Sequence, residues 1–85
     1  MQTISREIRG IPHFLLIEYL QEMGGKLVEE DLVEGAGWRV WLSRMEPYRL
    51  GSLVVGQTQL KIQIEDERVD DFFDRLNKKT LRAGA

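Results

Sequence analysis

One histidine and three serines are the residues of this sequence that could supply a general base or a nucleophile. His13 has no acid or nucleophile nearby in the sequence to orient it, so we expect an exposed polar residue at the start of a helix. None of the serines lies in the G-x-S-x-G context of a nucleophile elbow. The absence of cysteine excludes thiolate zinc sites, iron–sulfur clusters and cysteine nucleophiles. We therefore expect a protein that is not an enzyme and has no catalytic residue.

Acidic runs and paired glycines are the next candidates for binding chemistry. Consecutive carboxylates at residues 29–31 and 65–67 point in different directions, which favours a solvated edge or a helix cap over a metal site. The glycines at 24–25, 35–37 and 51 lack the spacing of a phosphate loop or a dinucleotide fingerprint, so we interpret them as turns. No metal or cofactor is expected.

The length and composition of the chain limit the class of protein to which it can belong. The chain has 85 residues and a net charge of -2, which predicts one domain over residues 1–85 without the basic excess that nucleic-acid binding requires. It lacks a membrane-spanning apolar run and the apolar core of a signal peptide, so we expect a cytoplasmic protein with no membrane partner. Because eight of the twelve basic residues are arginine, the composition is compatible with a thermophilic source.

Hydrophobic periodicity predicts four strands and two helices. The strands are expected over residues 3–11, 26–34, 38–45 and 50–65, with a bulge in the second, a turn at 46–48 and a bend at Gly56. The helices are expected over residues 12–23 and from the N-cap Asp66 onward.

The order strand-helix-strand-strand-strand-helix predicts a two-layer α+β sandwich, an antiparallel sheet with both helices on one face. Its core is expected to contain Trp38, Val40, Leu60, Ile62, Phe72 and Phe73, and Leu53 and Val55 are expected to be covered from both sides.

The opposite, open face of the sheet is the candidate interaction surface. Its residues are Arg39, Trp41, Met45, Gln57, Gln59, Lys61 and Gln63. The side chain of Trp41 on this face can be accommodated in three ways. A second copy of the chain covers it in a homodimer, another partner covers it, or it lies over the aliphatic stems of Arg39 and Lys61.

Short motifs along most of the chain carry a family resemblance. They are Arg9-Gly10-Ile11-Pro12, Tyr19-Leu20, Gly24-Gly25, Val33-Glu34-Gly35 with Gly37-Trp38, Gly51-Ser52-Leu53, and Lys79 with Arg82-Ala83-Gly84. With them the chain resembles a small prokaryotic domain family of unassigned function, known from thermophilic bacteria and archaea. In archaea a similar domain appears behind ubiquitin-like sulfur carriers of the molybdopterin synthase small-subunit type. The resemblance implies a role beside sulfur transfer or molybdenum cofactor synthesis and names no catalytic residue.

Two departures separate the chain from the carriers themselves. The expected element order differs from the β-grasp order, and the sequence ends in Gly84-Ala85 where a carrier needs a terminal Gly-Gly. We therefore expect a protein-interaction domain accessory to sulfur-carrier or molybdenum cofactor biosynthesis, and no sulfur carrier. The alternative is a binding module for single-stranded nucleic acid or a small anionic ligand on the open sheet face.

Overall fold

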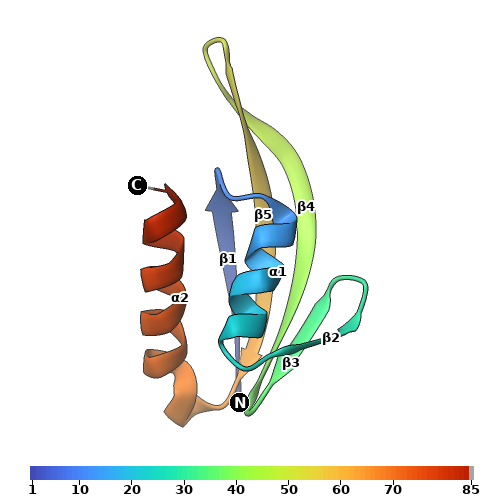
Figure 1. The fold of residues 1–85 in the computed structure, drawn as a ribbon, viewed down its shortest axis with the longest axis vertical. Helices are drawn as coiled ribbons and strands as arrows, with labels where there is room; N and C mark the ends of the chain where they lie inside the picture. Colours follow the sequence, from blue (N-terminus) through green and yellow to red (C-terminus); the bar gives the residue numbers. More distant parts are fainter. Residues whose placement is uncertain (85) are drawn as a thin grey trace.

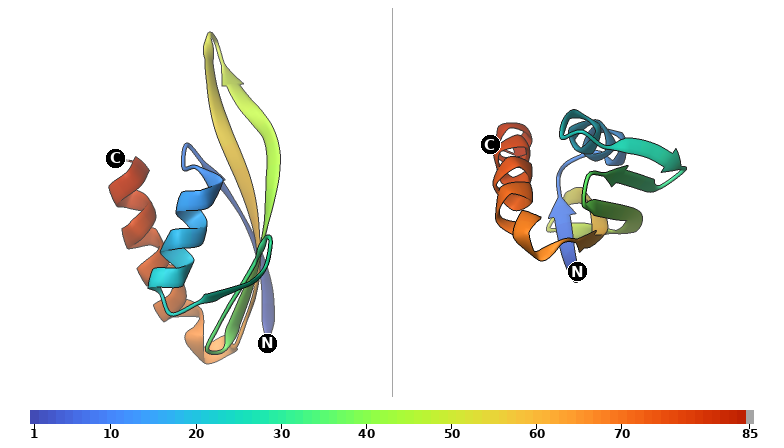
Figure 2. Two further views of the ribbon diagram at one scale, coloured as in Figure 1. Left: turned by 45° about the vertical axis from the view of Figure 1, so that its right-hand side comes forward. Right: turned by 90° about the horizontal axis from the view of Figure 1, so that it is seen from below.

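The computed structural model describes residues 1–84 and shows a five-stranded antiparallel sheet with two helices (Figure 1). The elements in chain order are β1 (Gln2–Arg9), α1 (His13–Glu22), β2 (Lys26–Glu29), β3 (Leu32–Gly35), β4 (Trp38–Leu50), β5 (Leu53–Ile64), the 3-10 turn η1 (Asp66–Arg68) and α2 (Val69–Gly84). The strands lie in the order β1-β5-β4-β3-β2, and both helices pack on one face (Figure 2). The α+β sandwich is thereby confirmed. Ala85, on which the terminal comparison with sulfur carriers depends, lies outside the described residues.

The boundaries of two predicted elements were wrong. Residues 26–34 form two short paired strands, because the acidic residues Glu30 and Asp31 make the turn of a hairpin between them. The expected bulge is present, as a register shift between Leu27 and Glu29. Helix α2 begins at Val69 after a 3-10 turn that includes Asp66.

The prediction of a turn at residues 46–48 was also wrong. Strand β4 continues to Leu50, and the extra residue at Glu46–Pro47 is absorbed by a register shift between Met45 and Tyr48. A proline in a strand is tolerated at such a bulge because its missing N–H interrupts the ladder there anyway. The chain reverses instead after Leu50, where Gly51 has a φ of +61° that favours glycine.

The hydrophobic core lies between the sheet and the two helices. Alternate residues of β4 and β5 face it, among them Val40, Leu60 and Ile62, which are fully buried. The predicted core cluster is confirmed, and Leu16, Leu20 and Leu76 of the helices complete it. Within the described part of the chain, neither helix has the length and hydrophobicity needed to cross a membrane.

Candidate functional site

The seven residues expected on the open sheet face lie on β4 and β5 and alternate with the buried core residues of those strands. In the register of the sheet, Arg39 stands opposite Gln63, Trp41 opposite Lys61, and Met45 opposite Gln57. Gln59 stands opposite Ser43. The structure therefore brings all seven together on the face turned away from the helices.

Trp41 on this face is half-buried by its own chain. The guanidinium carbon of Arg39 and the ammonium nitrogen of Lys61 each lie 5.7 Å from the centroid of its ring, within the range of cation–π attraction. Leu32, its partner on β3, is buried although it does not belong to the core under the helices. As cross-strand partners, Trp41 and Leu32 share the open face of the sheet, and the half-buried indole leaves only part of its surface for a partner.

A second surface, which the sequence reasoning missed, lies at the end of the β4–β5 hairpin. This hairpin end (residues 48–55) projects well beyond both helices and the other strands (Figures 1 and 2). Leu50, Leu53 and Val54 there are 60%, 63% and 59% exposed. The expectation that Leu53 is covered from both sides was wrong, because both helices lie below this part of the sheet. The signal in the sequence was the unbroken apolar run 53–55, which has no polar alternation.

Contacts at the base of the hairpin end hold it in place. The guanidinium of Arg9 lies 4.1 Å from the ring centroid of Tyr48, and Arg9 Nε donates a 3.0 Å hydrogen bond to Gln57 Oε1. Gln57 Nε2 in turn donates to the carbonyl oxygen of Glu46 at 3.0 Å. Pro47 lies at the bulge of β4, and a proline and a bulge on an edge strand disfavour pairing with another strand. Binding by this surface would therefore use its side chains.

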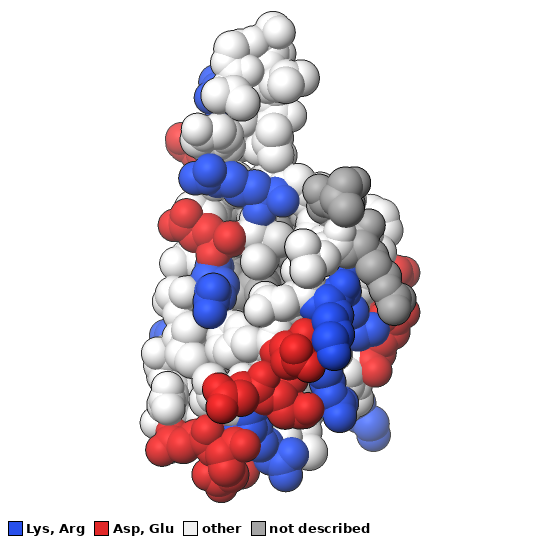
Figure 3. Space-filling model, turned by 90° about the vertical axis from the view of Figure 1, so that its left-hand side faces the viewer, with Lys and Arg blue, Asp and Glu red and all other residues white. Residues whose placement is uncertain are grey.

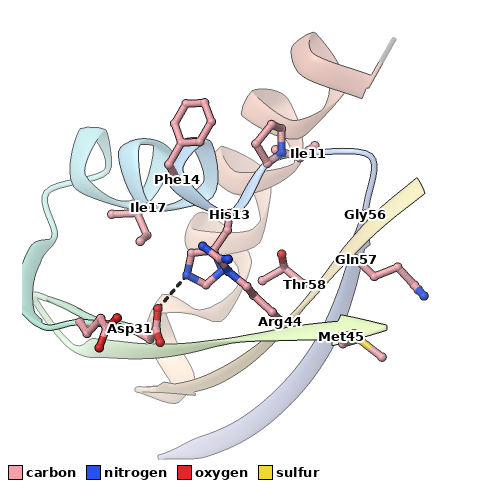
Figure 4. Close-up of a pocket in the computed structure, with 12 residues that line it drawn as sticks. Ile11, His13, Phe14, Ile17, Asp31, Arg44, Met45, Gly56, Gln57 and Thr58 are labelled. Atoms are coloured by element: carbon pink, nitrogen blue, oxygen red, sulfur yellow. Dashed lines mark hydrogen bonds and ion pairs between the residues drawn. The ribbon is translucent and has the colours of Figure 1, made fainter. Parts of the chain in front are cut away.

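His13 lies in a pocket beneath the start of α1, with a volume of about 520 Å³ (Figure 4). Its Nε2 hydrogen-bonds to Asp31 Oδ1 at 2.8 Å, and its side chain is only 12% exposed. The expectation of an exposed histidine without an orienting partner was wrong. The partner is 18 residues away, in the β2–β3 turn, whose Asp31 carbonyl also accepts a 2.9 Å hydrogen bond from the Leu42 amide.

The described residues offer no constellation for a resident metal. Among the side chains that the structure describes, those of residues 1–81, no group of three or more histidine or carboxylate side chains is arranged to hold a metal ion. His13 and Asp31 form a pair rather than part of such a cluster.

Comparison with known proteins identifies the family. No curated protein matches the sequence. The family model described as "Archaeal MoaD-like protein" matches residues 4–85, which span β1 to α2, so the resemblance carried by the short motifs is confirmed. The chain therefore belongs to the archaeal MoaD-like protein family, which links it to sulfur-carrier and molybdenum cofactor biosynthesis.

Proposed function

We propose that this chain is a non-catalytic cytoplasmic domain that binds a protein partner, either a sulfur carrier or an enzyme of molybdenum cofactor assembly. The observation that carries the proposal is the projecting hairpin end, with Leu50, Leu53 and Val54 exposed beyond the core. Contiguous exposed apolar side chains are typical of interaction sites. Fully burying one such side chain contributes roughly 1.5 to 3 kcal/mol, so a few anchors are enough for a specific complex.

The charges around the hairpin end indicate the chemistry of the partner. On the face shown in Figure 3 the projecting end consists almost entirely of uncharged residues, whereas acidic and basic side chains gather below it over α2. Those on α2 neutralise one another, as in the pairs Arg75–Asp71 and Lys78–Asp74. Arg9 beside the hairpin end and Arg49 within it have no ion-pair partner among residues 1–81, whose side chains are described. We therefore expect the partner protein to offer an apolar groove for the hairpin end, with carboxylates at the rim of that groove to pair with the two arginines.

The open sheet face extends this surface. Met45 and Gln57 lie next to the base of the hairpin end, and Arg39, Trp41, Gln59, Lys61 and Gln63 continue from them along β4 and β5. Glutamine side chains suit such a rim because they can hydrogen-bond across an interface and to water when it is open. Self-association and binding of single-stranded nucleic acid are the alternatives for the same face.

The test compares two variants of the full chain. Leu53→Glu places a charge on the hairpin end, and Leu81→Glu is the matched control because Leu81 is 68% exposed on α2. Binding to the sulfur carriers and molybdenum cofactor assembly proteins of the same organism is measured by titration calorimetry. Leu53→Glu should weaken the complex by about 30-fold or more, as for a residue worth 2 kcal/mol, whereas Leu81→Glu should leave it unchanged.

Three results would contradict the proposal. They are the absence of binding to any of these proteins, equal effects of the two substitutions, and binding only to a single-stranded oligonucleotide. Sedimentation of the free chain at several concentrations separates self-association from binding to a different protein.

A further inference from the structure

The floor of the pocket beneath α1 contains a polar residue where the fold calls for an apolar one. Thr58 lies on the helix-facing side of β5, in line with Leu60, Ile62 and Ile64, and it is 3% exposed. It is the one buried polar residue among those described. Its side chain points into the pocket (Figure 4). Among the described side chains, the buried polar atom without a hydrogen-bond partner is Nδ1 of His13, in the same pocket. Burial of an unpartnered polar atom is costly, which indicates that a ligand supplies its partner.

Arg44 stands beside Thr58 as an unpaired cation. It is the cross-strand partner of Thr58 in the β4–β5 register, and its side chain rises from β4 toward His13 (Figure 4). Asp31, which also lines the pocket, is hydrogen-bonded to His13 at 2.8 Å. Arg44 itself makes no ion pair within the described residues. The His13–Asp31 pair thus leaves the guanidinium free to bind an anion.

The remaining walls restrict the class of ligand. Ile11, Phe14 and Ile17 give the pocket an apolar side, and Glu30 and Asp31 add negative charge near its rim. Two carboxylates disfavour a doubly charged phosphate. A carboxylate carries a single charge, and its two oxygens match the fork of a guanidinium. The volume of about 520 Å³ lies in the range of small-molecule sites.

We propose that the pocket beneath α1 binds a carboxylate attached to a short apolar group. Arg44 and the hydroxyl of Thr58 hold the carboxylate, and Ile11 and Ile17 hold the apolar group. His13 is a positioning residue, because its Nε2 holds the carboxylate of Asp31 at 2.8 Å. The site lies on the helix side of the sheet and shares Met45 and Gln57 with the open sheet face, but it does not include the hairpin end. Two sources could present this chemistry: a free small acid, or the carboxyl terminus of a protein chain.

Amide chemical shifts of the full chain provide the test. Titration with isovalerate should give saturable shifts in residues 11–17, 44–45 and 56–58, whereas the uncharged isovaleramide should not. A short peptide ending in a free valine carboxylate, compared with its amidated form, distinguishes a chain end from a free acid. Tighter binding of the free peptide than of isovalerate would assign the chain end as the source.

Substitutions connect the binding to the two polar groups. Arg44→Gln should weaken isovalerate binding by about tenfold or more, since it removes a charge-assisted hydrogen bond. Arg49→Gln, on the same strand but outside the pocket, should leave it unchanged. Thr58→Val keeps the shape and removes the hydroxyl, so it should weaken binding by several-fold without loss of fold. Leu53→Glu should not affect this titration, which separates failure here from failure of the proposed partner surface.

Three outcomes would overturn the proposal. The first is the absence of saturable shifts with both carboxylate probes. The second is equal binding of the acid and the amide, and the third is equal effects of Arg44→Gln and Arg49→Gln, because either would show that the carboxylate is not recognised by Arg44.

Discussion

Gly35 lies directly against the indole of Trp38, its partner in the β3–β4 register, so that a side chain at position 35 would overlap the ring. Gly25 makes room on another side, since a Cβ there would lie 2.6 Å from Trp38 Cη2. The ring thereby reaches Phe72 of α2, with 5.1 Å between centroids. The Gly-x-Gly-Trp step is therefore a packing element as well as a turn, with Gly37 at a φ of +79° making the turn.

The first prediction concerns this packing. Gly35→Ala should lower the free energy of unfolding by about 1 to 3 kcal/mol, because Trp38 must move out of its rotamer or the β3–β4 hairpin must shift. Gly56→Ala is the control: its added Cβ meets nothing within 4 Å and its φ is not positive, so the change should stay within about 0.5 kcal/mol. Urea unfolding measures both. Equal stability of the two variants would show that the indole accommodates a neighbour at position 35.

The second prediction concerns the docking of α2. Phe73 is buried and lies edge-on to Phe72, with 5.3 Å between the ring centroids. The guanidinium carbon of Arg6 lies 4.6 Å from the centroid of the Phe73 ring. Phe73→Ala should cost about 3 to 5 kcal/mol, a large part of the stability of a chain this small. Phe14→Ala removes the same ring from an exposed position and should cost far less. Thermal melts of both variants decide the matter; a small shift for Phe73→Ala would mean that α2 packs loosely.

Local periodicity was enough to predict the layers of the fold. The alternation of Val40 and Leu42, and of Leu60 and Ile62, identifies the buried face of β4 and β5, and the spacing of Phe72, Phe73 and Leu76 identifies the buried face of α2. These patterns depend only on neighbours in sequence, which is why they can be read from one chain. The boundary at residue 46 was missed because a bulge tolerates the proline that suggested a turn.

The candidate sites depend on relationships that a single sequence does not contain. The pairing of His13 with Asp31 arises because the β2–β3 hairpin folds back under α1, which joins residues from two elements. The exposure of Leu50 and Leu53 depends on where the helices end in space, because the hairpin continues past them. The parity of the open sheet face, in contrast, was predictable, since it follows from the same alternation as the core.

The third prediction compares the two tryptophans on opposite faces of the sheet. Trp38 is buried in the core and Trp41 is half-buried between two cationic side chains. Trp38→Ala should cost about 3 to 5 kcal/mol, whereas Trp41→Ala should cost no more than about 1 kcal/mol and should weaken any complex formed on the open sheet face. Chemical unfolding gives the first quantity and sedimentation the second. A larger loss for Trp41→Ala would mean that cover of Leu32 is its main role.

The last prediction concerns the coupling between His13 and Asp31. The imidazole is largely buried and the carboxylate is half-exposed, so their 2.8 Å hydrogen bond should be partly screened by water. A double-mutant cycle with His13→Ala, Asp31→Ala and the double variant should give a coupling of about 0.5 to 1 kcal/mol. The exposed pair Arg75–Asp71 on α2, separated by 3.2 Å, is the control and should give less. If the two couplings are equal, the contact does not fasten the β2–β3 turn to α1, and the isolation of Arg44 needs another cause.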